Sequence, residues 1–380
     1  MKTLTKILSA FLAGCMLITL CACHGKDETA LTIEDEKITS ALYLNALIEC
    51  DSEARGRVDE QIAAAKENET ENTEEAEEET DYYSQTIDGL KFADYVKAEA
   101  LERCKEYVFY EKLIKDGTIK LEDAEITTAE SYAEAYWAQY GYAYLYEPNG
   151  VSFETYKKAF VYTYYSNAYF NHLYKEGGEK EVSQKDLKAN MLENYTLAYV
   201  LTATYEENST DDQKAELKKK LEGYEKRLKD GEDFETIYLE YNGINPEEHT
   251  HEETTDGPKD QHATILADKD LESNYANADF DSIYDLKFGE TVIIENEGKT
   301  GLTLYVKLDI SKDAYYLKAL TDEILYEMKH EEFETFVKEQ TKDYKVDENS
   351  FATDRFDVED IDYSELEALY ASANAAQQQY

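Results

Sequence analysis

Three histidines and a group of carboxylates lie in one polar stretch of the chain, and their side chains could together hold a metal ion. His249 and His251 form a His-x-His pair, and His262 follows further along. The carboxylates of the same stretch are Glu247, Glu248, Glu252, Glu253 and Asp256. Imidazole and carboxylate groups bind zinc and other divalent ions. A His-x-His pair without a third ligand at a fixed spacing is a weak signal, so the sequence favours a solvated loop and leaves metal binding as the alternative.

The chain offers few other groups for covalent chemistry. Of its five cysteines, Cys50 and Cys104 alone lie beyond the first 25 residues. Both occur in helix-like apolar patterns, so we expect two buried reduced thiols, although a single bridge between them is possible. The sequence contains no Gly-rich phosphate loop, Ser-His-Asp arrangement or paired-carboxylate motif. We therefore predict no catalytic residue and no cofactor.

The N-terminus has the pattern of a lipoprotein export signal. Two early lysines precede an apolar segment, residues 7–20, that ends at Leu-Cys-Ala-Cys. Such a segment is too short for a stable membrane span of ~20 residues, which disfavours a plain transmembrane anchor. We expect residues 1–22 to be removed and Cys23 to carry the lipid on the extracytoplasmic face of a bacterial membrane. Cys15, in Leu-Ala-Gly-Cys, is a second candidate, but cleavage there would leave an apolar start to the mature protein.

The composition limits the partners of the chain. Asp and Glu total 84 against 39 Lys and Arg, a net charge of −45 over 380 residues. A polyanion would be repelled, so nucleic acid is excluded as a partner. The chain also has 34 tyrosines but one tryptophan and three prolines. Little in it breaks helices, and many side chains combine an apolar ring with a polar hydroxyl.

Helical periodicity dominates the first half of the chain and its last quarter. A short strand and a polar turn lead into a helix from Thr39 or Ser40 to about residue 65, followed by a Glu-rich stretch, 66–83, that we expect to be a disordered insertion. An apolar stripe predicts the next helix, with Phe92, Val96, Ala100, Cys104 and Val108 in the core. Further helices are predicted from Thr128 or Ser131, at 153–176 and at 314–344.

Aromatic side chains recur on two of these helices at helical spacing. A stripe of this kind is more often core than a binding face, but tyrosine hydroxyls need partners when they are buried. We treat one group as tentative binding residues for unfolded polypeptide: Tyr132, Tyr136, Trp137, Tyr140, Tyr144, Phe160 and Tyr164.

The pattern changes between residues 196 and 312. Strands are predicted at 196–205, 263–266, 291–295 and 302–309, with the last two forming a hairpin around Gly298. Capping boxes at Ser183 and Thr210 predict helix starts, and short helices are expected at 234–241 and 280–286. These elements describe a small α+β unit enclosed by helices. The acidic segment after Phe351 is expected to be a loosely held tail with a short helix at 364–373.

This order of elements resembles the exported foldases of the PrsA and SurA type. The similar segments are LTIEDEKITSALYLNALIE (31–49), GVSFETYKKAF (150–160), EKEVSQKDLKANMLENY (179–195), KRLKDGEDFETIYLEY (226–241) and FDSIYDLKFGE (280–290). The resemblance implies an α+β fold in which a helical chaperone domain, built from both chain ends, surrounds an inserted parvulin-like domain. The implied division is 23–195 for the N-terminal part, 196–312 for the parvulin-like domain, 313–350 for the completing helix and 351–380 for the tail.

The sequence departs from the parvulin pattern at the positions that matter for catalysis. Parvulin domains carry one His on the first strand and another on the last, where this chain has Val200 and Thr303. Losing that polar network argues against strong catalysis of proline isomerisation. The resemblance therefore implies a chaperone for unfolded exported proteins. An active peptidyl-prolyl isomerase and an acidic metal- or solute-binding surface lipoprotein remain as alternatives.

Overall fold

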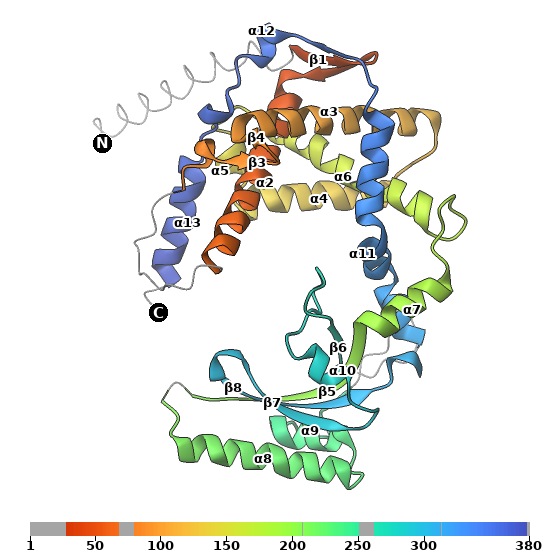
Figure 1. Ribbon diagram of the computed structural model, residues 1–380, viewed down its shortest axis with the longest axis vertical. Helices are drawn as coiled ribbons and strands as arrows, with labels where there is room; N and C mark the ends of the chain where they lie inside the picture. Colours follow the sequence, from red (N-terminus) through yellow and green to blue (C-terminus); the bar gives the residue numbers. More distant parts are fainter. Residues whose placement is uncertain (1–27, 68–79, 207, 251–261, 313, 378–380) are drawn as a thin grey trace, which may run out of the picture. The chain divides into compact units, whose positions relative to one another are not determined.

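The computed structural model describes residues 28–67, 80–206, 208–250, 262–312 and 314–377 (Figure 1). It combines long helices with small antiparallel sheets, so the fold class is α+β, as predicted. The chain divides into two compact units. Unit 1 contains the described residues up to Leu173 and from Glu332 onward, and unit 2 contains Tyr174–Glu331. The predicted parvulin-like segment, 196–312, lies inside unit 2.

Unit 1 is built on two long helices that pack against each other, α2 (Ser40–Glu67) and α3 (Phe92–Asp116). The stripe predicted for α3 is buried along its length, from Phe92 to Val108. The helix ends where Gly117 takes a left-handed conformation, φ 80°, that glycine adopts without strain. The other helices of this part of the chain are α4 (Asp123–Gln139), α5 (Ala143–Tyr146) and α6 (Phe153–Tyr174), and α11 (Ala314–Thr341) continues into unit 1 from unit 2.

A small sheet joins the two ends of the chain in unit 1. Its strand order is β2-β1-β9, with β1 at Thr29–Ile33, β2 at Glu36–Thr39 and β9 at Val346–Glu348. The strand β2 is absent from the sequence-based expectation, which placed only a turn between the first strand and the helix. A second hairpin, β3 (Thr86–Ile87) with β4 (Leu90–Lys91), precedes α3.

Helix α4 begins earlier than predicted. Its first residue is Asp123, and the backbone N–H of Glu122 donates to Oε2 of Glu125 at 2.7 Å in a capping box. The hydroxyls of Thr128 and Ser131 instead donate to backbone carbonyls one turn back, so neither residue caps the helix. The prediction favoured Ser and Thr as caps and overlooked a Glu-based box.

The prediction of a loosely held acidic tail was wrong for the described part of it. The elements α12 (Ser350–Thr353), η5 (Val358–Asp360) and α13 (Ser364–Gln377) follow β9. Val358 and Ile361 are buried, and the Tyr363 hydroxyl donates to Oδ2 of Asp51 on α2 at 2.6 Å. A few apolar and aromatic side chains in an otherwise acidic segment are enough to hold it on the helical unit.

The predicted insertion at 66–83 is ordered at both of its ends. Lys66 and Glu67 complete α2, and Tyr82 and Tyr83 lie in the short helix η2 (Tyr82–Ser84) with their rings 6.1 and 5.5 Å from that of Phe92. Residues 68–79 lie outside the described part of the chain, as does the whole N-terminal segment that contains Cys15 and Cys23.

The two cysteines of unit 1 are free and buried, as predicted. Cys50 lies on α2 and Cys104 on α3. Burial raises the pKa of both thiols, because the thiolate would lose its hydration. Neither thiol is activated as a nucleophile.

Unit 2 contains a four-stranded antiparallel sheet of order β6-β5-β8-β7. The strands are β5 (Tyr195–Thr204), β6 (Ala263–Ala267), β7 (Thr291–Glu295) and β8 (Gly301–Leu308). Helix α7 (Gln184–Asn194) runs directly into β5, and the helices α8 (Asp211–Lys229), α9 (Phe234–Asn242) and α10 (Phe280–Tyr284) lie between strands along the chain. The Ser183 and Thr210 caps are both confirmed.

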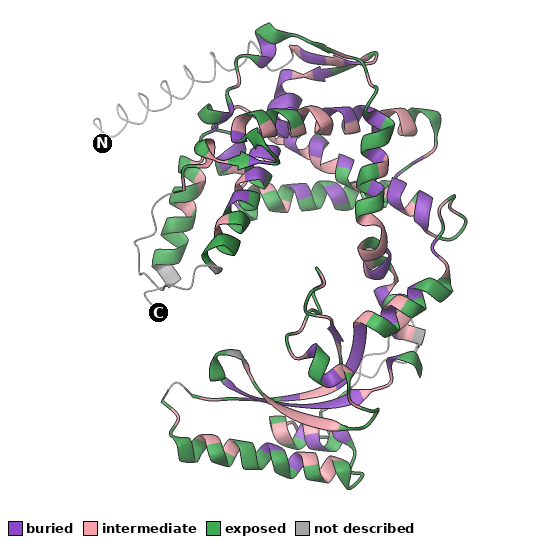
Figure 2. Cartoon of the chain, viewed as in Figure 1, coloured by how far each residue is buried: buried purple, intermediate pink, exposed green. Residues whose placement is uncertain are grey.

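The two faces of this sheet are covered differently. Alternate residues of β5 and β8, such as Leu201 and Leu304, pack with Leu221 of α8 and Ile237 of α9. The outer side of α8 is mostly exposed (Figure 2). The opposite face packs on α10 through Phe280. Because α10 is short, part of this second face remains open, and Val200, Val292 and Ile294 on it are only partly buried.

Candidate functional sites

Four exposed tyrosines lie on α4, at its C-cap and on α5, and we name them the tyrosine surface. Tyr132, Tyr136, Tyr140 and Tyr144 are 54, 36, 59 and 44 % exposed. The residues on α4 are four apart, so they lie on one side of that helix. The rings of Tyr136 and Tyr140 stack at 5.0 Å. Exposed aromatic rings in a row offer a broad apolar contact area with hydroxyls at its edge.

Helix α6 extends this surface. The ring of Phe160 lies 5.7 Å from that of Tyr136, and the ring of Tyr164 lies 6.2 Å from that of Phe160. Both are partly exposed. Ring contacts therefore join four of the seven aromatic residues that the sequence proposes for binding, and Tyr132 and Tyr144 are exposed on α4 and α5.

Trp137 takes a different place. Its ring packs against Phe153 and Tyr156 of α6 at 5.5 and 5.4 Å and against Tyr146 of α5 at 6.1 Å. Tyr146 and Tyr156 are buried. The tryptophan therefore anchors α4 against the neighbouring helices beside the tyrosine surface.

The open face of the unit 2 sheet carries Val200 and Thr303, the positions that the sequence resemblance matches to parvulin histidines. Val200 pairs with Tyr305 across β5 and β8, and Thr202 pairs with Thr303, so all four side chains lie on one face. The hydroxyls of Thr202 and Thr303 are 3.1 Å apart, and Thr303 donates to Oδ1 of Asn296 at 2.8 Å. The hydroxyls of Thr202 and Thr303 therefore have hydrogen-bond partners, and none of the four paired residues is a histidine.

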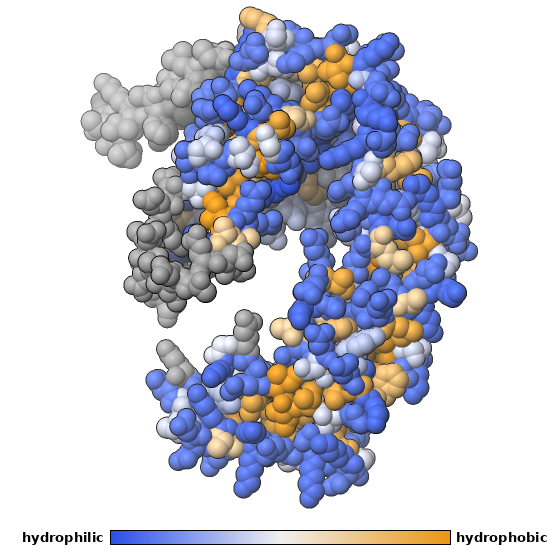
Figure 3. All heavy atoms as spheres, in the orientation of Figure 1, coloured by the Kyte–Doolittle hydropathy of each residue, from blue (hydrophilic) through white to orange (hydrophobic). Residues whose placement is uncertain are grey.

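Tyr305 and Lys307, two residues apart on β8, are titratable groups on this face. The Tyr305 hydroxyl donates to Oδ2 of Asp279 at 3.0 Å. Burial, together with the charge of Asp279, raises the pKa of Tyr305 to about 12. The phenol is therefore protonated at neutral pH and is a poor general acid. Figure 3 shows hydrophobic side chains gathered over the strands of unit 2.

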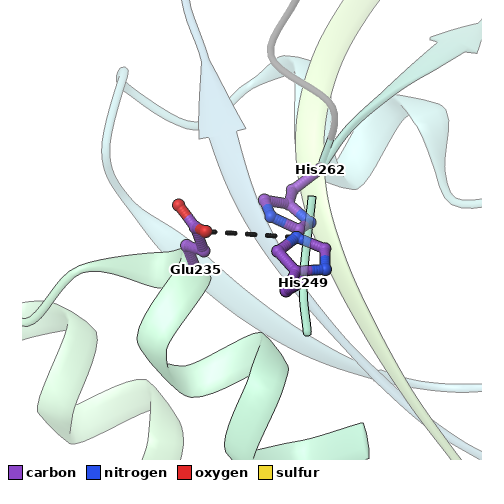
Figure 4. Close-up of side chains that lie close together, drawn as sticks. All are labelled: Glu235, His249 and His262. Carbon is purple, nitrogen blue, oxygen red and sulfur yellow. Dashed lines mark ion pairs between the residues drawn. The ribbon is translucent and has the colours of Figure 1, made fainter. Parts of the chain in front are cut away.

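Two of the three predicted metal candidates come together in unit 2. His249, in the loop after α9, and His262, directly before β6, have ring centroids 5.3 Å apart (Figure 4). Glu235 of α9 joins them, with Oε1 4.0 Å from Nε2 of His249. His251 lies outside the described residues. The sequence analysis did not identify Glu235, because this residue belongs to a helix and not to the loop that contains the histidines. Its position in the first turn of α9 brings its carboxylate close to them.

Comparison with known proteins finds similarity among solved structures. No protein-family model matches the sequence, and no curated protein matches it. The foldase protein PrsA from Streptococcus pneumoniae is similar in structure, at 12% sequence identity and a TM-score of 0.33. The similarity covers 71% of this chain and 83% of the PrsA chain.

Proposed function

We propose that this protein is an exported, membrane-anchored chaperone that holds unfolded polypeptides, and that its parvulin-like unit lacks ordinary isomerase activity. The observation that carries the proposal is the tyrosine surface. It consists of exposed or partly exposed rings on α4, α5 and α6, several of which are in contact, and it belongs to a helical unit built from both ends of the chain.

Tyrosine suits the binding of unfolded chains. Its ring contributes apolar area at the cost of ordering few torsions, and its hydroxyl tolerates water when no client is bound. Such a surface can hold many sequences without a fixed register, which a chaperone requires and a specific enzyme avoids. The strongly acidic composition would keep the protein soluble while the surface is exposed.

The open face of the unit 2 sheet offers a second apolar area. Val200, Val292 and Ile294 are partly buried there beside hydroxyls that already have hydrogen-bond partners. Among the described residues of this face, no imidazole is placed to act as an acid or a base. An extended apolar segment could bind there, whereas stabilisation of a twisted amide would lack the tuned polar groups that catalysis needs.

Removing the exposed tyrosines should weaken the holding activity. We expect the Tyr132→Ser, Tyr140→Ser double variant to need about tenfold more protein to suppress aggregation of a reduced, unfolded model protein, a loss of roughly 1.4 kcal/mol in binding. The measurement is light scattering at several molar ratios.

The matched control changes two exposed tyrosines elsewhere, Tyr275 and Tyr326, which are 37 and 55 % exposed. The Tyr275→Ser, Tyr326→Ser variant should suppress aggregation like the unchanged protein. Equal activity in both double variants, with unchanged circular dichroism, would refute the assignment of client binding to the tyrosine surface.

Anchoring depends on Cys23 in this proposal. No helix of the described residues is long and apolar enough to cross a membrane. We expect Cys23→Ala to abolish incorporation of radiolabelled fatty acid and to leave the protein either unprocessed or shed from the membrane, whereas Cys15→Ala should leave lipidation and processing unchanged. The reverse pattern would assign the lipid to Cys15.

A further inference from the structure

We propose that Glu235, His249 and His262 form a binding site for a divalent transition-metal ion, with Zn²⁺ as its best representative. The three side chains come from three places in the sequence: the first turn of α9, the loop that follows it and the residue before β6. This site goes beyond the proposed chaperone function and does not depend on it.

The geometry is close to that of a metal site. One ligand atom from each residue can be chosen so that all three lie within 4.8 Å of one another. Ligands about 2.1 Å from a tetrahedral zinc ion lie about 3.4 Å apart. Nε2 of His249 is already 4.0 Å from Oε1 of Glu235, so small side-chain rotations would bring these donors to bonding positions (Figure 4).

Packing limits how the two imidazoles can move. The His262 ring lies 4.5 Å from the ring of Tyr238 and 6.2 Å from that of Phe234, both on α9. Phe234 stacks in turn on Tyr199 of β5 at 4.0 Å. The His249 side chain is only 18 % exposed and is nearly parallel to His262, at 20°. Aromatic side chains of α9 and β5 thus support His262, and the His262 ring stacks on that of His249.

The donor set indicates the class of metal. Two imidazoles and one carboxylate match the ligands of zinc sites that keep an open position, and they suit Fe²⁺, Co²⁺ and Ni²⁺ as well. Ca²⁺ and Mg²⁺ prefer sites made entirely of oxygen ligands. One coordination position would be left for water or for a group from another molecule.

A bound metal ion would link the residues that precede and follow segment 251–261. His249 and His262 would be joined to each other and to α9, which packs on the sheet through Phe234 and Ile237. An ion that binds the folded state alone stabilises that state by mass action. Unit 2 should therefore become more resistant to unfolding when the ion is present.

The test titrates tag-free full-length chain with Zn²⁺ by calorimetry, and with Co²⁺ by its d–d absorption. We expect one equivalent to bind, the cobalt spectrum to show four or five coordination, and Tm to rise by about 5–10 °C at roughly 100 times the Kd. Ca²⁺ and Mg²⁺ should produce no shift. Glu235→Gln, on a partly exposed side chain, should weaken zinc binding at least tenfold without unfolding the protein, and His262→Ala should abolish it.

The control is His330→Ala, which removes one histidine of α11 that lies outside the group and should bind zinc like the unchanged protein. Binding that survives both Glu235→Gln and His262→Ala would overturn the proposal. So would loss of binding in His251→Ala alone, because the ligands would then differ from the three assigned here. A titration that shows no saturable zinc binding would overturn it directly.

Discussion

Replacing Asp51 by alanine is expected to lower the free energy of unfolding of unit 1 by about 3 kcal/mol. The Asp51 side chain is fully buried on α2 and binds Nε of Arg55 at 2.7 Å and the Tyr363 hydroxyl at 2.6 Å. Arg55 also donates to the Tyr83 hydroxyl, which donates to the carbonyl of Val358. Alanine would leave the guanidinium and the phenol without their carboxylate and would release the C-terminal segment. Chemical denaturation followed by circular dichroism measures the loss.

Two variants separate the contributions to this effect. Tyr363→Phe keeps the ring under Arg55, whose guanidinium carbon lies 4.2 Å from its centroid, and removes one hydrogen bond, so we expect a loss of about 1–2 kcal/mol. Asp51→Asn keeps a hydrogen-bond acceptor and should cost less than Asp51→Ala. If Asp51→Ala unfolds at the same denaturant concentration as the unchanged protein, the network does not hold the C-terminal segment.

The ionisation of Asp51 should also make the free energy of unfolding depend on pH, and the direction of its pKa shift fixes the sign. Burial raises the pKa of this carboxyl above its ordinary value, against the opposing effects of Tyr363 and Arg55. The folded state therefore binds the proton more tightly than the unfolded chain does. The part of the stability that depends on protonation of Asp51 is fully present below the ordinary pKa and is lost as the pH rises through the raised pKa, whereas the contacts with Arg55 and Tyr363 do not require that proton. Relative to Asp51→Asn, the unchanged protein should gain stability as the pH falls through this window.

The full-length chain is expected to accelerate proline isomerisation in a tetrapeptide by less than about tenfold, which is under 1.4 kcal/mol of a barrier of ~20 kcal/mol. Val200 and Thr303 occupy the positions that the family resemblance gives to histidines. The Thr303 hydroxyl is engaged by Thr202 and Asn296, and the phenol of Tyr305 stays protonated because its pKa is about 12. A protease-coupled assay with an active parvulin at equal concentration measures the difference.

The same sample must suppress aggregation for this result to be informative. Holding activity without isomerase activity would agree with the proposed function. A rate within tenfold of the active parvulin would contradict it, and Tyr305→Phe would then be the first variant to test, because this titratable phenol pairs with Val200 on the open sheet face.

The sequence by itself determined the features that depend on neighbouring residues. The apolar stripe from Phe92 to Val108 defined α3 and its buried side, because a period of four places those residues on one side of a helix. Local capping chemistry located the starts of α7 and α8 at Ser183 and Thr210. The alternating strands around Gly298 gave the hairpin β7–β8, and their combination with the helices gave the α+β class.

Only the tertiary structure decided which residues from distant parts of the chain meet. Tyr363 holds the acidic C-terminal segment through Asp51, a contact between residues 312 positions apart. Among the aromatic residues of α4, Trp137 turns toward α6 while Tyr132 and Tyr136 stay exposed, because a regular spacing does not say which side of a helix meets a neighbour. Glu235 reaches His249 and His262 only because α9 packs on the sheet to which β6 belongs. The spacing of apolar residues predicts a helix or strand locally, whereas the packing of one element against another depends on the whole chain.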